Sequence, residues 1–231
     1  MTDVAVLCGG LGTRLREVTG EAPKVLAEVG DRPFLHFLID FAAGQGFKRF
    51  VLCAGYKAGE VENYFKGKCP GLTIDFSRED RPLGTGGALR HAAGLIRSED
   101  VIVLNGDSFC RVDYAKLLEA HRLSGCAATI VASRMPSARD YGRLGLDENG
   151  RVVSFAEKSG DGPANVNAGV YCFNRQLVSS FPSTVPLSLE KDVFPSLLGK
   201  GVYAFVTEQP FYDIGTPERY LKTREIFGHG Q

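Results

Sequence analysis

The first 110 residues alternate short apolar runs with longer amphipathic stretches, and this pattern constrains the fold more than any other feature of the sequence. Residues 4–8, 49–54, 72–77 and 101–105 are typical of buried strands, whereas residues 33–45, 58–65 and 85–95 are typical of helices. Strands that alternate with helices predict a mostly parallel sheet covered by helices on both faces. Ligands bind such sheets beyond the carboxyl ends of the strands.

The second half is less regular and predicts a mixed sheet. We expect helices over residues 113–124, 189–198 and 217–226, strands over residues 127–133, 166–173 and 202–207, and a hairpin over residues 144–155. Pro195 interrupts the second of these helices. No stretch is rich enough in proline, serine or charge to form a linker, and no internal repeat is visible. We therefore expect one continuous α/β domain over residues 1–231.

The charge balance limits the partners that the chain can attract. Lysine plus arginine and aspartate plus glutamate number 27 each, which predicts no bulk attraction to nucleic acid or to an anionic membrane. No apolar run approaches the roughly 20 residues that span a bilayer, and the start lacks a basic leader. We expect a cytoplasmic protein in which phosphate binding is local. Its six scattered cysteines are expected to be reduced core residues rather than zinc ligands or disulfides.

A glycine-rich loop over residues 9–14, with the sequence Gly-Gly-Leu-Gly-Thr-Arg, follows the first expected strand. Its glycines allow backbone amides to approach a phosphate chain without obstruction by side chains. A P-loop would need lysine and a hydroxyl residue directly after the last glycine, and a dinucleotide fingerprint would need a small residue where Leu15 stands. An NAD-type oxidoreductase is therefore disfavoured, while a purely structural glycine turn stays an alternative.

Two cations and two carboxylates accompany this loop. Arg14 ends the loop and Lys24 follows a proline, and both types of charge suit a triphosphate. Asp107 directly follows an apolar strand, which places it at the same sheet edge as the loop, and Asp213 precedes the last expected helix. Carboxylates suit magnesium, which prefers oxygen ligands. The alternatives are turn aspartates and a solvated surface lysine, and sequence spacing does not show whether the aspartates converge.

Seven sequence blocks occur in one order along the chain. They are residues 9–15, Pro23-Lys24, residues 83–87 (Leu-Gly-Thr-Gly-Gly), 105–107 (Asn-Gly-Asp), Glu157-Lys158, 167–169 (Asn-Ala-Gly) and 213–217 (Asp-Ile-Gly-Thr-Pro). In this order they resemble the sugar-phosphate nucleotidyltransferase family over nearly the whole chain. Residues 55–57 and 188–192 favour a branch of it that acts on a heptose 1-phosphate. The resemblance implies a single-domain, Rossmann-like, mixed and mostly parallel sheet with helices on both faces.

The resemblance implies that residues 1–110 mainly bind a nucleoside triphosphate. The implied nucleotide-binding residues are Leu7, Gly9, Gly10, Gly12, Thr13, Arg14, Glu79, Gly84, Thr85 and Gly106. Arg14 would hold the β- and γ-phosphates and Lys24 would neutralise the α-phosphate, so that both act in catalysis together with Asp107. Asp107 and Asp213 would hold Mg²⁺.

The same resemblance implies that residues 111–231 mainly bind a sugar 1-phosphate. The implied contacts are Tyr141, Gly142, Glu157, Lys158 and Asn167, with Glu157 and Asn167 on hydroxyl groups and Lys158 on the phosphate. Without the family, Glu157-Lys158 would be an exposed charge pair. The product would be a precursor of a surface glycan such as lipopolysaccharide, capsule or S-layer. A homodimer is compatible with a domain of this size, and no hexapeptide repeats of a fused acyltransferase are present.

Glu79 bears on the identity of the base. An ionised glutamate only accepts hydrogen bonds, which suits the N1 and N2 donors of guanine and fits a pyrimidine imide poorly. This favours GTP, while CTP and ATP are compatible and a uridylyltransferase acting on a hexose or amino-sugar phosphate stays an alternative. An inactive nucleotide-sensing subunit is an alternative of another class, which the intact Arg14, Lys24, Asp107 and Asp213 disfavour.

Overall fold

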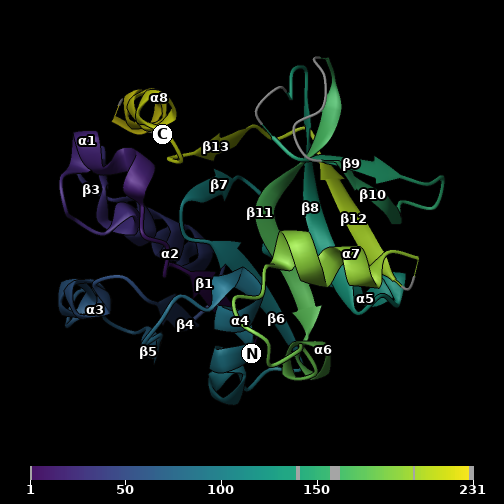
Figure 1. Cartoon of the computed structure of the whole chain (residues 1–231), viewed down its shortest axis with the longest axis horizontal. Coiled ribbons are helices and arrows are strands. Elements are labelled where there is room, and N and C mark those ends of the chain that lie inside the picture. The colour runs from purple at the N-terminus through teal and green to yellow at the C-terminus, as the bar shows by residue number, and fades with distance from the viewer. Residues whose placement is uncertain (1, 139–140, 157–161, 200, 229–231) are drawn as a thin grey trace.

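A computed structural model describes residues 2–138, 141–156, 162–199 and 201–228 (Figure 1). A nine-stranded sheet runs through the molecule in the order β10-β9-β11-β6-β1-β4-β5, with β8 and β12 continuing from β11. The strands β1 (Asp3–Leu7), β4 (Arg49–Ala54), β5 (Thr73–Arg78) and β6 (Asp100–Asn105) are mutually parallel and form one side of the sheet. Their carboxyl ends therefore lie along one edge.

The other side of the sheet is organised around one long strand. β11 (Ala164–Asn174) is antiparallel to β6, β8 (Ala128–Met135) and β9 (Arg143–Leu146). β10 (Val152–Ala156) completes a hairpin with β9, and β12 (Val202–Thr207) is parallel to β8. The expected mixed sheet in a single α/β domain is confirmed, because β11 joins the two sides by backbone hydrogen bonds.

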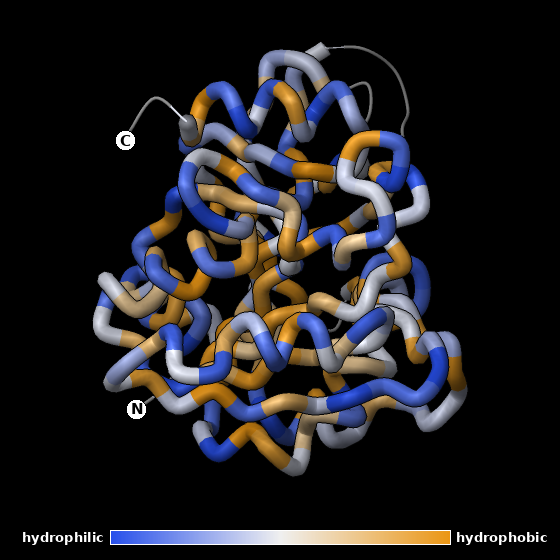
Figure 2. The backbone as a smooth tube through the Cα atoms, turned by 90° about the vertical axis from the view of Figure 1, so that its left-hand side faces the viewer, coloured by the Kyte–Doolittle hydropathy of each residue, from blue (hydrophilic) through white to orange (hydrophobic). Residues whose placement is uncertain are grey.

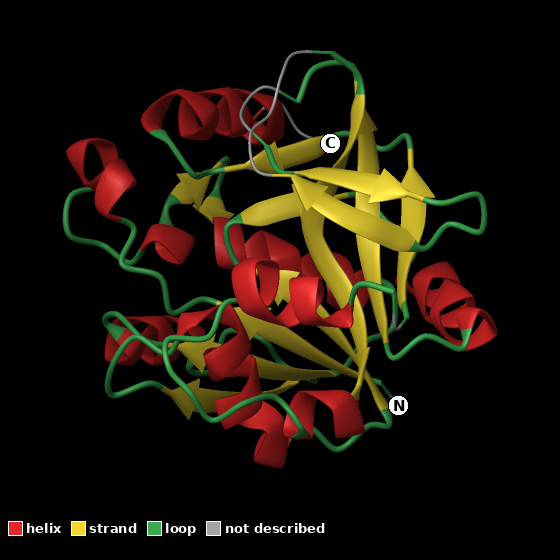
Figure 3. Ribbon diagram, turned by 45° about the vertical axis from the view of Figure 1, so that its right-hand side comes forward, coloured by secondary structure: helices red, strands yellow, loops and turns green. Residues whose placement is uncertain are grey.

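Helices cover both faces of the sheet, as Figure 3 shows. Side chains alternate along a strand, so Val4 and Val6 pack on one face and Ala5 on the other. The first face is covered by α2 (Phe34–Gly44), α3 (Ala58–Phe65) and α5 (Tyr114–Ser124). The second is covered by α4 (Gly84–His91), α6 (Arg175–Ser179) and α7 (Phe194–Leu197). Hydrophobic segments accordingly gather in the interior in Figure 2.

A third cluster attaches the C-terminal helix α8 (Pro217–Gly228) beside the sheet. Tyr220 of α8 packs with Phe34 and Leu38 of α2 and with Phe109. Phe109 belongs to β7 (Ser108–Cys110), which pairs with β13 (Phe211–Asp213), the segment that leads into α8 (Figure 1). This short ladder brings together residues about a hundred positions apart.

The short elements were not expected from the sequence. They are the pair β2 (Glu28–Val29) and β3 (Arg32–Pro33), the β7–β13 pair, α1 (Arg16–Thr19), α6 and the 3-10 turns Thr13–Leu15, Lys24–Leu26 and Ala92–Leu95. The helix expected over residues 189–198 is instead a π-turn, Leu189–Val193, followed by α7, with Pro195 in the first turn of α7. Proline fits there because the amide N–H groups in the first turn of a helix have no carbonyl acceptor within the helix. The missing N–H of proline therefore costs no hydrogen bond.

All six cysteines are free thiols, and all but Cys69 are buried. Among the described residues no helix is long and apolar enough to cross a membrane.

Candidate active site

The carboxyl ends of β1 and β6 bring two of the sequence blocks together. Leu7 and Asn105 are register partners at the ends of these strands, and the Gly106 amide donates a hydrogen bond to the Leu7 carbonyl at 2.9 Å. The glycine loop therefore begins beside Asp107. Gly9 also needs to lack a side chain, because a Cβ there would lie 2.3 Å from Glu79 Oε1 and 3.1 Å from the Gly55 amide nitrogen.

A cavity of about 300 Å³ opens at this edge. Its lining includes the expected nucleotide-binding residues Leu7, Gly9, Gly10, Glu79, Gly84 and Thr85, together with Lys24 and Asp107. Gly12, Thr13, Arg14 and Gly106 do not line it. Asn105, which does, has a buried Oδ1 with no hydrogen-bond partner in the described part of the chain. Sequence reasoning assigned no separate role to Asn105, although it stands in the Asn-Gly-Asp block.

Lys24 and Asp107 form an ion pair inside this cavity. Lys24 Nζ donates to Asp107 Oδ2 at 2.5 Å, and the side chains are 11% and 41% exposed respectively. The lysine is held by the turn Lys24–Leu26 after Pro23, and the aspartate by the end of β6. The pair presents a positive and a negative charge side by side at the cavity wall, an arrangement suited to a phosphate and its counter-cation.

Glu79 occupies the wall opposite β6. It follows β5, where its amide donates to the Ala54 carbonyl, and its Oε2 accepts a hydrogen bond from the Leu83 amide at 3.0 Å. Burial raises the pKa of this carboxyl, while the hydrogen bond from Leu83 opposes that shift. Glu79 is therefore a partly buried hydrogen-bond acceptor whose ionised form is disfavoured by its burial.

The turn before α4 is tied to the segment that precedes α7. Gly84 has a φ of +76°, and a Cβ at this position would lie 2.5 Å from the Leu187 carbonyl oxygen. The Thr85 hydroxyl donates to Glu190 Oε2 at 2.9 Å and accepts from the Leu189 amide at 2.8 Å. Glu190 was missed as a separate residue, and the signal that could have found it is its block, residues 188–192.

Asn167 belongs to a polar group beside this contact. Its Nδ2 donates to the Tyr171 hydroxyl at 3.0 Å and its Oδ1 accepts from the Gly169 amide at 3.0 Å. The Tyr171 hydroxyl also lies 3.4 Å from Glu190 Oε1. Burial raises the pKa of Tyr171 well above its usual value, so its hydroxyl stays protonated. These contacts fix the orientation of the Asn167 amide.

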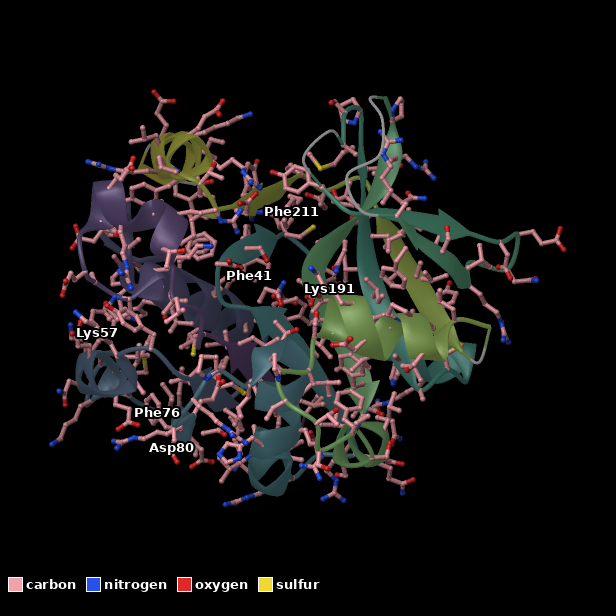
Figure 4. All side chains as sticks on the ribbon, viewed as in Figure 1. Phe41, Lys57, Phe76, Asp80, Lys191 and Phe211 are labelled. Atoms are coloured by element: carbon pink, nitrogen blue, oxygen red, sulfur yellow. The ribbon has the colours of Figure 1, made fainter. Side chains whose placement is uncertain are left out.

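A second cavity, of about 920 Å³, holds Arg14, Tyr141 and Asp213. Asp213 Oδ2 accepts from the Tyr141 hydroxyl at 2.7 Å and from Arg219 Nη1 at 3.0 Å, and Oδ1 accepts from the Gly215 amide at 2.7 Å. Burial, and then the bond to Asp213, raise the pKa of Tyr141 to about 12. Phe211, labelled in Figure 4, stacks edge-on against Tyr141 with ring centroids 5.2 Å apart.

The backbones of the two aspartates converge, whereas their carboxylates bond to different cations. The Ile214 amide donates to the Asp107 carbonyl at 3.0 Å, and Asp213 pairs with Ser108 in the β7–β13 ladder. Asp107 bonds to Lys24 and Asp213 to Arg219, and each lines its own cavity. Within the described residues no group of three histidine, cysteine or acidic side chains could hold a metal.

The donor chemistry of the two aspartates nevertheless fits magnesium. Each carboxylate oxygen has two lone pairs, and among the described residues Asp107 bonds only through Oδ2 while Asp213 Oδ1 accepts a single bond. Oxygen ligands are therefore left on two residues whose backbones lie close together, and a magnesium ion needs few protein ligands besides water and phosphate.

The expected sugar contacts are placed only for some residues. Gly142 is exposed and lies directly before β9, next to Tyr141. Glu157 and Lys158 lie outside the described residues.

Comparisons with known proteins place this chain among nucleotidyl transferases. A family model described as nucleotidyl transferase matches residues 4–227. Mannose-1-phosphate guanylyltransferase of Mycobacterium tuberculosis is 38% identical over 225 residues, which cover 95% of this chain but 63% of the relative. D-glycero-alpha-D-manno-heptose 1-phosphate guanylyltransferase of Aneurinibacillus thermoaerophilus is 34% identical over 228 residues, which cover 98% of this chain and 99% of the relative.

Two solved structures are also similar to this chain. The crystal structure of HddC from Yersinia pseudotuberculosis complexed with GMP-PN has a TM-score of 0.88 at 35% identity, and the match covers 98% of this chain and 100% of that one. A putative glucose-1-phosphate thymidylyltransferase from Bacillus anthracis has a TM-score of 0.85 at 16% identity, a likeness of fold.

Proposed function

This chain belongs to the nucleotidyl transferase family, and from that premise we propose that it transfers a guanylyl group from GTP to a sugar 1-phosphate, releasing pyrophosphate and a GDP-sugar. The sugar that we propose is D-glycero-α-D-manno-heptose. The observation that carries the proposal is the match to the heptose relative, which covers 98% of this chain and 99% of the relative. The mannose relative is a longer protein, of which this chain spans 63%.

The proposal that the nucleotide is GTP rests on one residue of the cavity wall, Glu79. Glu79 lines the cavity of the glycine loop with a carboxylate that accepts hydrogen bonds when ionised. Guanine presents N–H donors at N1 and N2, so the carboxylate matches its edge, and the HddC structure with GMP-PN is a guanine nucleotide complex of a similar protein. The glycine loop and Gly84-Thr85 would enclose the base and ribose, and Asn105 Oδ1 offers a further acceptor.

The proposed reaction is a displacement at the α-phosphorus of GTP. An oxygen of the sugar phosphate forms the new bond to phosphorus, and the bond from phosphorus to the bridging oxygen of the β-phosphate breaks. The electron pair leaves with pyrophosphate, and no proton needs to move because the attacking oxygen is already anionic. Lys24 would neutralise the α-phosphate and Arg14 the leaving phosphates, so that catalysis consists of alignment and charge stabilisation.

Magnesium would be held by Asp107 and Asp213 and would supply charge neutralisation at the phosphates. For the sugar 1-phosphate we propose Tyr141, Gly142, Glu157, Lys158 and Asn167, with the fixed Asn167 amide contacting a hydroxyl group. Residues 1–110 would mainly serve the nucleotide and residues 111–231 the sugar phosphate. We further propose a cytoplasmic location and a homodimer, the latter to be checked by light scattering.

The deciding experiment measures pyrophosphate release with magnesium. Each of GTP, UTP, CTP, ATP and dTTP is offered with D-glycero-α-D-manno-heptose 1-phosphate, mannose 1-phosphate, glucose 1-phosphate and N-acetylglucosamine 1-phosphate. We expect release with GTP and the heptose phosphate at the highest kcat/KM. Preference for GTP with mannose 1-phosphate would keep the guanylyl transfer and replace the sugar, and preference for UTP would reject the assignment of Glu79.

A protein that binds GTP but releases no pyrophosphate with any sugar phosphate would contradict the enzymatic assignment. It would then be a nucleotide-sensing subunit. The variant Lys24→Ala separates contaminating activity from the chain's own, because a contaminant would be unaffected by the substitution.

A further inference from the structure

Arg219 stands at a position that no expected role explains. It lies in the first turn of α8, where its Nε bonds to the Thr216 hydroxyl at 3.2 Å and its Nη1 donates to Asp213 Oδ2 at 3.0 Å. Its guanidinium carbon lies 5.2 Å from the centre of the Tyr141 ring. The side chain is 24% exposed and that of Asp213 is 9% exposed, so this is a largely desolvated ion pair.

The other predicted metal ligand, Asp107, is also paired with a cation of the protein. Lys24 neutralises Asp107 as Arg219 neutralises Asp213, so each carboxylate carries its own protein cation. A buried carboxylate without a counter-charge is unstable. The pairs therefore place a positive charge beside each aspartate, Asp107 between β6 and β7 and Asp213 at the end of β13.

We propose that Arg219 is the counter-ion and positioning residue of Asp213, and that its charge lowers the affinity of this site for a divalent cation. The inference rests on the proposed function, since it takes Asp213 as a metal ligand. The Tyr141 hydroxyl and Arg219 Nη1 use both lone pairs of Asp213 Oδ2, and the Gly215 amide uses one of Oδ1, so the second lone pair of Oδ1 would be the one available to a metal. A positive charge within a few ångströms opposes the binding of another cation.

The substitution Arg219→Gln tests this inference, because glutamine keeps an N–H donor and removes the charge. Lys222→Gln is the matched control. Lys222 lies on the same helix and lines the same cavity, and no hydrogen bond or ion pair joins it to Asp213 among the described residues. It therefore reports the loss of one charge from the cavity without the loss of the pair. Arg219→Lys keeps the charge and should restore the behaviour of the natural chain.

Binding of Mn²⁺, a spectroscopic substitute for Mg²⁺, is measured by electron paramagnetic resonance on the full chain without nucleotide. We expect Arg219→Gln to bind Mn²⁺ about three- to tenfold more tightly, because a like charge near the site is removed. Without metal its Tm should fall, since Asp213 has lost its counter-ion, and added Mn²⁺ should raise its Tm by more than that of the natural chain. Lys222→Gln and Arg219→Lys should match the natural chain in both measurements.

The outcomes separate the inference from the function on which it rests. Unchanged or weaker Mn²⁺ binding by Arg219→Gln, in a protein that performs guanylyl transfer, would overturn the role of Arg219 and leave the function standing. The expected Mn²⁺ shift in a protein that transfers no guanylyl group would support Arg219 as the counter-ion and reject the function. If Lys222→Gln tightens Mn²⁺ binding as much as Arg219→Gln does, the cause is the general charge of the cavity rather than the Arg219–Asp213 pair. That result would also overturn the inference.

Discussion

At the scale of single residues, the Lys24–Asp107 pair decides how much positive charge the cavity can offer a phosphate. Lys24 Nζ is held 2.5 Å from Asp107 and is only 11% exposed, so its ammonium is positioned before any substrate arrives. A preorganised cation stabilises developing charge without reorganisation in the transition state.

The first prediction is that Lys24→Ala lowers kcat by about 10²- to 10³-fold, as expected for loss of one preorganised charge contact. The partner Asp107 is 41% exposed, and water can solvate it after the substitution. The free energy of unfolding should therefore change by no more than about 1 kcal/mol. The measurements are steady-state kinetics and thermal unfolding, with Lys116→Ala, an exposed lysine on α5, as the control. An activity loss that is explained by complete unfolding would contradict a catalytic role.

The second prediction concerns Glu79 and pH. Burial raises the pKa of this carboxyl, so as the pH falls it takes up a proton before an ordinary glutamate does. Only the ionised form accepts both guanine donors, and the KM for GTP should therefore rise as the pH is lowered from 8 toward the raised pKa. Cys8 and Cys53 beside it have raised pKa values and stay neutral over this range.

Glu79→Gln removes the titrating group at nearly constant volume. We expect a KM for GTP about tenfold higher at pH 8, from loss of a charge-assisted hydrogen bond, and a much weaker dependence of that KM on pH. If the variant keeps the pH profile of the natural chain, another group carries the dependence.

At the scale of elements, the turn before α4, which lines the cavity of the glycine loop, is held against the segment 187–190. Gly86 and Gly87 both donate their amides to the Leu187 carbonyl, at 2.8 and 3.1 Å, and Leu187 donates back to Leu83 at 2.8 Å. The two segments can lie this close only because the turn carries no side chain at Gly84.

The third prediction is that Gly84→Ala destabilises the fold by at least about 1 kcal/mol, because a φ of +76° is unfavourable for alanine and its Cβ would lie 2.5 Å from a carbonyl oxygen. That loss lowers Tm by several degrees in a chain of this size. Gly44→Ala is the matched control: Gly44 ends α2 with nothing within 4 Å of a built Cβ, so alanine should be neutral or stabilising. Equal Tm changes in both variants would reject the argument from the close approach.

The long elements were predictable from the sequence and the short ones were not. The observed bounds of β4, α3 and β12 match the expected ones to the residue, because each has a clear period and is bounded by turn residues. The ladder β7–β13 has three residues in each strand, too few for a period to show. Its pairing depends on contacts between residues far apart in sequence, and so does the approach of Tyr141 to Asp213.

The sequence predicted which residue types lie at the sheet edge of the site, but it did not predict which side chains these residues contact. A parallel sheet puts the ends of β1 and β6 side by side, which is why Asp107 could be expected near the glycine loop. The same reasoning does not place Arg14, which lines the second cavity rather than the one that holds Lys24. Residues of α8 and β8, far from Arg14 in sequence, also line that second cavity, and no local pattern encodes how these elements come together.

At the scale of the whole molecule, β11 joins the first half of the chain, residues 1–110, to the second half, residues 111–231, in one sheet. Its residues 170–174 pair with β6, and most of its length pairs with β8. Both main hydrophobic clusters contain side chains from each half, such as Leu104 with Cys172 in one and Val103 with Tyr171 in the other. The functional division that we propose near residue 110 therefore does not coincide with a division between hydrophobic cores.

The fourth prediction follows from this arrangement: the chain should unfold in a single thermal transition, and a fragment of residues 1–110 should not fold alone. Removal of residues 111–231 would expose the free edge of β6 and take side chains away from both main hydrophobic clusters, and the loss of buried apolar surface would exceed a typical stability of about 5–15 kcal/mol. Far-ultraviolet circular dichroism reports on the backbone of the whole chain. Tyrosine fluorescence reports on both halves, because the eight tyrosines are found in both and the chain has no tryptophan. We expect coincident transitions, shifted together to higher temperature by GTP, because a ligand that binds only the folded state stabilises every element coupled to it. Two separate transitions, with only the lower or the upper one moved by GTP, would show that the halves are independent domains and that β11 does not couple them.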